Sequence, residues 1–336
     1  MSAVLALLLL VFGLVFLLAG AEALVGSAAS LARRFGVSEF VVGLIVVAFG
    51  TSAPELFASV GAVLQGEPDL AVGNVIGSNI ANVLLILGAG GLIAPIAMDR
   101  RVRTVEIPVM TGVTLLSVAL MLDQALGRIE GALLVAGLGL YVLWAVRAGA
   151  VEPAEDAPAP GPAWKAFLLA AIGIGALAIG SRSVVVGASA IAARAGVSEG
   201  VIGLTIVAFG TSLPELAATV RAAIGRKSDI AVGNIIGSNV FNLLSVLGAC
   251  AVVAPLTLPD AMIRHGLTMT GVTLMLLVVG LARPVIGRGF GLFFLAAYLS
   301  YAIVAYRAPG AANPPVRPKL PAIGTDDGPE ERPDSP

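Results

Sequence analysis

Residues 43–60 read GLIVVAFGTSAPELFASV, and residues 203–220 read GLTIVAFGTSLPELAATV. These stretches are identical at 13 of 18 positions when the chain is shifted by 160 residues. A second pair, DLAVGNVIGSNIANVLLILG at 69–88 and DIAVGNIIGSNVFNLLSVLG at 229–248, is identical at 13 of 20. The chain is therefore a duplication of one unit. We predict a first repeat over 1–150, a linker over 151–163, a second repeat over 164–306 and a disordered, Pro- and Gly-rich tail over 307–336.

The composition excludes a soluble enzyme and a nucleic-acid-binding protein. Of the 336 residues, 58% are hydrophobic and only 12% are charged, against roughly 25% charged in ordinary globular domains. The 20 basic and 21 acidic residues nearly cancel, so no basic field exists to attract nucleic acid. A chain of this kind is expected to lie in a lipid bilayer.

Stretches of about 20 apolar residues, the length that crosses a bilayer as a helix, follow one another along the sequence. We predict an all-α integral membrane protein with ten transmembrane helices, at approximately 2–24, 37–62, 69–96, 104–122, 128–147, 164–190, 197–222, 229–256, 262–281 and 285–306. The first stretch ends in Ala21, Glu22 and Ala23, a pattern that also suits signal cleavage, but no basic residue precedes it and it has a counterpart inside the chain. We therefore interpret it as a span.

Each repeat holds five spans, an odd number, so the second repeat crosses the membrane inverted relative to the first. With both termini on the non-cytoplasmic side, the cytoplasmic loops and the linker carry twelve Lys and Arg residues and the opposite loops carry four. Basic residues are retained on the cytoplasmic side. This ratio predicts a multi-pass protein of the cell (inner) membrane with both termini outside the cytoplasm, and inverted repeats are typical of secondary transporters.

Glu55 and Glu215 lie near the middle of their spans, where an unpaired carboxylate costs about 2.5 to 3.5 kcal/mol or more. No Lys or Arg lies within 43–60 or 203–220. Each glutamate follows a proline, which frees the carbonyl of the preceding turn, at Gly50 or Gly210, so we expect both helices to kink or break there. Helical spacing puts two hydroxyls on the face of each carboxylate, from Thr51 and Ser52 in the first repeat and from Thr211 and Ser212 in the second.

A polar stripe repeats in the next span of each unit. Its members step by four residues, as Asn74, Ser78 and Asn82, and again as Asn234, Ser238 and Asn242. Glycines at 73, 77, 233 and 237 form small-xxx-small faces, which we expect to bring each stripe close to the glutamate of the preceding span. The pooled groups are carboxylate, hydroxyl, amide and carbonyl oxygens, the ligands of calcium and sodium rather than of copper or zinc. Helix association through hydrogen bonds is the structural alternative for any single Ser or Asn.

Other polar residues receive structural interpretations. Cys250 lies in an apolar run and His265 in an apparent turn between helices, so neither supports redox, zinc or hydrolase chemistry. Asp69 and Asp229 open their spans and are expected to be helix N-caps. Glu22 is expected near a membrane interface, with no assigned role. No cofactor and no protein partner is expected.

The paired motifs GTSAPEL at 50–56 and GTSLPEL at 210–216, each followed by a GNxIGSN segment, resemble the two α-repeats of the sodium/calcium exchanger family. The resemblance extends over about 1–306. It implies a ten-helix antiporter in which a gating helix pair slides across an eight-helix core, and exchange of typically three sodium ions for one calcium.

Carried over position by position, the resemblance implies the ion ligands Thr51, Ser52, Glu55, Ser78, Asn82, Thr211, Ser212, Glu215, Ser238 and Asn242, with the carbonyls of Ala48 and Ala208. Some relatives carry aspartate at the position of Asn242, which leaves this chain one carboxylate fewer, argues against potassium co-transport and leaves stoichiometry open. The nearest alternative function is a calcium/proton antiporter that uses the same glutamates. A cation channel and a membrane-embedded enzyme are less consistent with one central ligand set and no nucleophile or cofactor motif.

Overall fold

The computed structural model describes residues 1–149, 162–197 and 208–307. The first repeat contains α1 (Ala3–Phe35), α2 (Glu39–Val42), the π-helical η1 (Gly43–Val47), α3 (Ala48–Leu64), α4 (Pro68–Ala81), the π-helical η2 (Asn82–Ile86), α5 (Leu87–Ile93), β1 (Ile96–Ala97), the π-helical η3 (Val102–Glu106), α6 (Ile107–Met121), β2 (Ala125–Leu126) and α7 (Arg128–Ala148). The second contains α8 (Ala163–Arg194), α10 (Ala208–Thr211), α11 (Leu213–Ile224), α12 (Ser228–Phe241), the π-helical η5 (Asn242–Leu247), α13 (Gly248–Val253), β3 (Leu256–Thr257), α14 (Asp260–Ala282), β4 (Val285–Ile286) and α15 (Arg288–Arg307).

The expected all-helical membrane architecture is confirmed. Within the described ranges, nine helices are long and apolar enough to cross a membrane, and their bounds follow nine of the ten predicted spans. The remaining span, predicted at 197–222, falls partly on 198–207, outside the described residues, and α10 and α11 occupy its second half. Residues 151–161 of the predicted linker and residues 308–336 of the predicted tail also lie outside the described residues.

Two short strand pairs join the repeats and agree with their inversion. β1 pairs with β4 and β2 pairs with β3, both antiparallel. With a shift of 160 residues, β1 corresponds to β3 and β2 to β4. Each pair therefore joins a loop of one repeat to a non-equivalent loop of the other. Inversion requires this, because equivalent loops of inverted repeats lie on opposite sides of the membrane and cannot pair.

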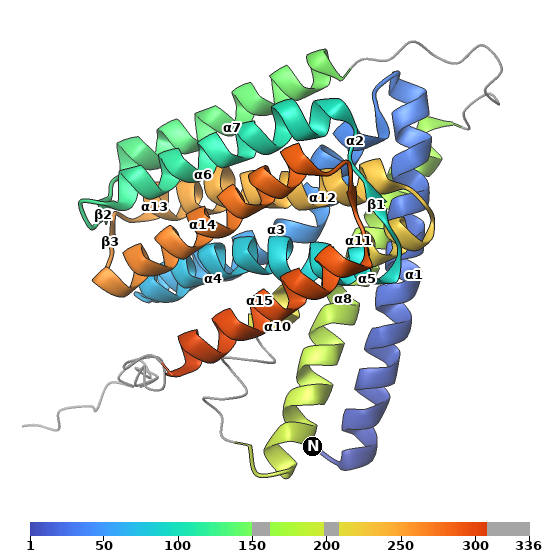
Figure 1. The fold of residues 1–336 in the computed structure, drawn as a ribbon. Coiled ribbons are helices and arrows are strands. Elements are labelled where there is room, and N and C mark those ends of the chain that lie inside the picture. The colour runs from blue at the N-terminus through green and yellow to red at the C-terminus, as the bar shows by residue number, and fades with distance from the viewer. Residues whose placement is uncertain (150–161, 198–207, 308–336) are drawn as a thin grey trace, which may run out of the picture.

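The long helices α1 and α8 lie against each other and extend together beyond the other helices (Figure 1). A Cβ built on Gly13 would lie 2.6 Å from the carbonyl oxygen of Gly180, and one on Gly20 would lie 2.8 Å from that of Gly173. Because these glycines carry no side chain, the two backbones approach closely. The α1–α8 pair is thus a symmetric contact between the repeats.

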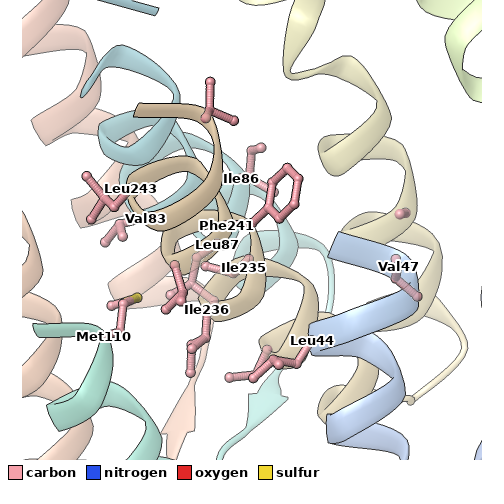
Figure 2. Packing of buried hydrophobic residues seen from close by; sticks show 14 of the residues in the cluster. Leu44, Val47, Val83, Ile86, Leu87, Met110, Ile235, Ile236, Phe241 and Leu243 are labelled. Atoms are coloured by element: carbon pink, nitrogen blue, oxygen red, sulfur yellow. The ribbon is translucent and has the colours of Figure 1, made fainter. Parts of the chain in front are cut away.

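The remaining helices form a bundle with an apolar interior. Its centre combines residues of both repeats (Figure 2), labelled Leu44, Val47, Val83, Ile86, Leu87, Met110, Ile235, Ile236, Phe241 and Leu243. Gly233 and Gly237 of α12 pack closely against Phe40, Leu44 and Ala48. These glycines therefore bring α12 against the other repeat, while α12 also contacts α11 of its own repeat. No described atom lies within 4 Å of a Cβ on Gly73 or Gly77.

Several local predictions were wrong. Asp69 and Asp229 are not N-caps, because the cap positions are Glu67 and Lys227; both aspartates lie in the first helical turn, where a negative charge suits the helix dipole. His265 lies inside α14, not in a turn, with Nδ1 3.5 Å from the Tyr301 hydroxyl.

The first helix is also longer than predicted. It continues to Phe35 and ends where Gly36 takes a left-handed conformation (φ 61°, ψ 36°), a common helix C-terminus. The Cys250 thiol is buried, as expected.

Candidate functional site

Two glutamates from different repeats lie buried in the bundle. Glu55 in α3 is 1% exposed and Glu215 in α11 is 2% exposed, and Ser52, three residues before Glu55 in α3, is hydrogen-bonded to Glu215. The nearest basic residue in the sequence, Arg221, forms an ion pair with Glu22 of α1 instead. The described part of the site therefore holds two acidic groups whose charges no Lys or Arg balances.

The hydroxyls of the first repeat bond to the second repeat. Ser52 Oγ donates to Glu215 Oε1 at 2.8 Å. Thr51 Oγ1 is 3.2 Å from Asn234 Oδ1 and 3.3 Å from the Ala48 carbonyl oxygen. Helical spacing predicted that both hydroxyls lie on the same face of the helix as Glu55. In the structure, Ser52 on that face contacts Glu215 of the other repeat.

The predicted polar stripes lie beside these glutamates. Ser78, Asn82, Ser238 and Asn242 are all buried, none more than 5% exposed. Segment η2, which begins at Asn82, contacts α11, and η5, which begins at Asn242, contacts α3. Each terminal asparagine thus starts a π-helical segment against the glutamate helix of the opposite repeat, and such irregular turns are frequent at functional sites.

The second repeat presents its ligand candidates at a helix break. Ser212 lies between α10 and α11 and is 2% exposed, and Thr211 is half-buried. Ala208 begins α10, and its side chain lies outside the described residues.

The prolines act differently in the two repeats. In the second repeat the helix is interrupted at Ser212, two residues before Pro214, as expected, whereas α3 of the first repeat continues through Pro54 without a break. Proline removes one backbone donor and a helix can tolerate this loss where neighbours compensate. The Gly210 carbonyl accepts a bond from Ser181 Oγ of α8 at 2.5 Å.

Several buried polar atoms have no hydrogen-bond partner among the described residues. Within the predicted ligand set these are Glu55 Oε2, Glu215 Oε2, Ser238 Oγ, Asn242 Oδ1 and Asn82 Nδ2. Burying such atoms without partners is unfavourable. Four of the five are oxygens, so a bound cation would satisfy groups that the protein leaves unpaired.

Sequence reasoning missed four buried residues near the set, namely Ser59, Thr219, Asn79 and Asn239. Asn74 donates to Ser59 at 2.9 Å, and Asn234 makes the equivalent bond to Thr219 at 2.9 Å. The other two, Asn79 and Asn239, are neighbours across the repeats. Their signal was available, because Ser59 and Thr219, like Asn79 and Asn239, lie 160 residues apart inside the duplicated blocks.

Inverted helical repeats around a buried, oxygen-rich, acidic centre define a secondary transporter of cations. The chain matches the family described as "Sodium/calcium exchanger protein" over residues 5–147 and 165–307, and it belongs to that family.

Similar proteins support this assignment. The candidate antiporter CaxA of Alkalimonas amylolytica is 41% identical over 86% of this chain and 95% of its own length. The inner membrane protein YrbG of Escherichia coli is 36% identical over 90% and 97%. A solved structure of the sodium-calcium exchanger NCX_Mj, soaked with Na⁺ and Sr²⁺, has a TM-score of 0.81 at 31% identity, and covers 91% of this chain and 100% of that one.

Proposed function

We propose that the chain is a secondary-active antiporter that exchanges sodium for calcium at a central site between its repeats. The proposal is carried by the two buried glutamates of opposite repeats, which lie among neutral oxygens and have no Lys or Arg partner among the described residues. We assign the ligands to Ala48, Thr51, Ser52, Glu55, Ser78, Asn82, Ala208, Thr211, Ser212, Glu215, Ser238 and Asn242.

The charge of the site explains why the two ions compete. Two carboxylates balance one calcium ion or two sodium ions, and hard oxygen ligands suit both. Neither ion can occupy the shared oxygens while the other fills them. Competition at one set of ligands then couples sodium entry to calcium exit without a second site.

We also propose alternating access through movement of α1 and α8 against the other helices. The glycine contacts hold α1 and α8 together as one body, and this pair extends beyond the bundle (Figure 1). Rigid-body movement of one element around a fixed midplane site is the usual basis of such transport.

Calcium uptake into liposomes that contain the purified protein tests the proposed coupling. An outward sodium gradient and an outward proton gradient are compared, each with the membrane potential clamped. We expect uptake with the sodium gradient and none above protein-free liposomes with the proton gradient. Uptake with protons alone would overturn sodium coupling and favour a calcium/proton antiporter at the same residues.

The similarity to an inner membrane protein and the distribution of basic residues support a location in the inner membrane, with both termini outside the cytoplasm. Glu67 and Arg226 are exposed in equivalent loops of the two repeats, and Cys250 is buried. In intact cells stripped of their outer membrane, an impermeant maleimide should label Glu67→Cys but not Arg226→Cys, and lysis should expose the second. Labelling of both before lysis, or the reverse pattern, would contradict this topology.

A further inference from the structure

Asn79 joins the two repeats through both ends of its side chain. Asn79 is only 2% exposed. Asn79 Nδ2 donates to the backbone carbonyl of Asn239 at 3.3 Å, and Asn79 Oδ1 accepts from Asn242 Nδ2 at 3.1 Å. Asn79 therefore contacts the candidate ligand Asn242 directly. Both of its own polar atoms are hydrogen-bonded to the second repeat, so neither is left to bind an ion.

The direction of these bonds is fixed by chemistry. A backbone carbonyl only accepts, so Asn79 must turn its NH₂ group toward Asn239 and its oxygen toward Asn242. Asn242 must then offer its own NH₂ group to Asn79. Its remaining polar atom, Oδ1, is the one that can bind a cation, and it has no hydrogen-bond partner in the described part of the chain.

We propose that Asn79 is a positioning residue that holds the Asn242 amide with its oxygen turned toward the transported ion. This inference rests on the proposed function, because it names which atom of Asn242 meets the ion. A rotated Asn242 amide would present two N–H donors to a cation, which is repulsive, so the orientation matters for affinity.

The equivalent residue of the second repeat is bonded differently. Asn239 Nδ2 donates to the Ile235 carbonyl of its own helix at 2.8 Å. Asn82, the counterpart of Asn242, has an Nδ2 atom without a partner among the described residues. The positioning bond is thus made on one side of the site only, and Asn239 provides a matched comparison of the same residue type and similar burial.

An aspartate at 242 would not need orienting, because its two carboxylate oxygens are equivalent acceptors. This property gives a test that separates positioning from general stabilisation. Calcium affinity is measured by titration calorimetry for Asn79→Ala, for Asn242→Asp and for the double variant, with the melting temperature of each protein recorded alongside.

Loss of a buried hydrogen bond that fixes a ligand corresponds to about tenfold in affinity. We expect Asn79→Ala to weaken calcium binding by about that factor when residue 242 is Asn, and not to weaken it when residue 242 is Asp, because the Asn79 oxygen then faces a carboxylate that has no N–H to donate. Asn239→Ala keeps the backbone carbonyl that Asn79 uses and should change affinity less than Asn79→Ala. If Asn79→Ala does not yield folded protein, Asn79→Leu, which retains the side-chain volume, replaces it in the same cycle.

An equal loss in both backgrounds would overturn the positioning role while leaving the exchanger function intact. Equal effects of Asn79→Ala and Asn239→Ala would also overturn it. Failure of the unsubstituted protein to bind calcium would instead contradict the proposed function. The two failures are therefore distinguishable.

Discussion

The two repeats carry equivalent side chains 160 positions apart, yet they bond them differently. In the first repeat α3 runs through Pro54, whereas the same stretch of the second repeat is divided at Ser212. The carbonyl of Gly210 accepts a bond from Ser181, but the residue equivalent to Ser181 is Ala21, which has no hydroxyl to donate. Asn79 bonds across the repeats and Asn239 bonds within its own helix.

This difference is what an inverted-repeat transporter requires. Identical repeats in identical conformations would give a site equally related to both sides of the membrane. When the repeats adopt different arrangements, access is one-sided, and exchange of arrangements gives access from the other side. In the proposed mechanism, the shared residues form the ion site and the unshared contacts separate one state from the other.

The largest expected effect comes from removing one charge from either repeat. Glu55→Gln and Glu215→Gln should each lower sodium-driven calcium uptake by at least about 100-fold, because the divalent ion loses half of its balancing charge in a buried site. Uptake into liposomes measures the effect. Near-normal uptake by either variant would show that the two glutamates are not both needed at the site, and so that the two repeats do not contribute equally.

A third buried glutamate serves as the control for these variants. Glu106 has Arg101 Nη2 at 3.0 Å and the Tyr141 hydroxyl at 3.5 Å, and its counterpart is Gly266. Glu106→Gln should lower the melting temperature, because Arg101 loses its partner, while the calcium concentration for half-maximal uptake stays unchanged. A calcium dependence altered as in Glu55→Gln would place Glu106 in the transport pathway.

A smaller effect is expected where the repeats meet in α1 and α8. A Cβ on Gly173 would lie 2.8 Å from the Leu24 backbone nitrogen, whereas no described atom lies within 4 Å of one on Gly175. Overpacking of this kind costs about 1 to 3 kcal/mol. Gly173→Ala should therefore reduce uptake several-fold with calcium binding retained, and Gly175→Ala should not; equal uptake by both variants would show that this contact is unimportant for transport.

The smallest effect concerns a contact that only one repeat can make. Glu22 of α1 pairs with Arg221 of α11, and the equivalent positions are Arg182 and Gly61, which cannot form an ion pair. Exposed pairs are worth about 0 to 1 kcal/mol. Glu22→Gln should shift the half-maximal calcium concentrations on the two sides of the membrane in opposite directions, by up to about fivefold.

The double variant with Glu22→Arg and Arg221→Glu restores the pair and should restore both values. Equal shifts on the two sides, or no rescue by the exchanged charges, would contradict a state-dependent contact. Liposomes with the protein oriented and calcium varied on one side at a time provide the measurement.

Much of the architecture follows from sequence alone. Apolar length predicted nine of the described spans, and the duplication around Glu55 and Glu215 predicted inverted repeats. Both signals are strong because membranes demand long apolar helices and because buried carboxylates are rare there. The burial of the polar stripes follows from the same reasoning.

The contacts between repeats could not be predicted in this way. Helical periodicity describes neighbours within one helix, so it gave no information on Ser52 meeting Glu215 or Asn79 meeting Asn242. The π-helical segments at Asn82 and Asn242 change the local period itself. The interruption at Ser212 but not at Pro54 depends on tertiary surroundings that nearly identical motifs do not encode.

The central claim is that one site, built from both repeats, binds calcium and sodium in competition. Titration calorimetry of calcium into the purified protein at increasing sodium concentrations tests it most directly, with Glu55→Gln and Glu215→Gln alongside. We predict one calcium ion per chain, an affinity that falls as sodium rises, and loss of binding in both variants. Calcium binding that is independent of sodium, or that persists in either variant, would contradict the account.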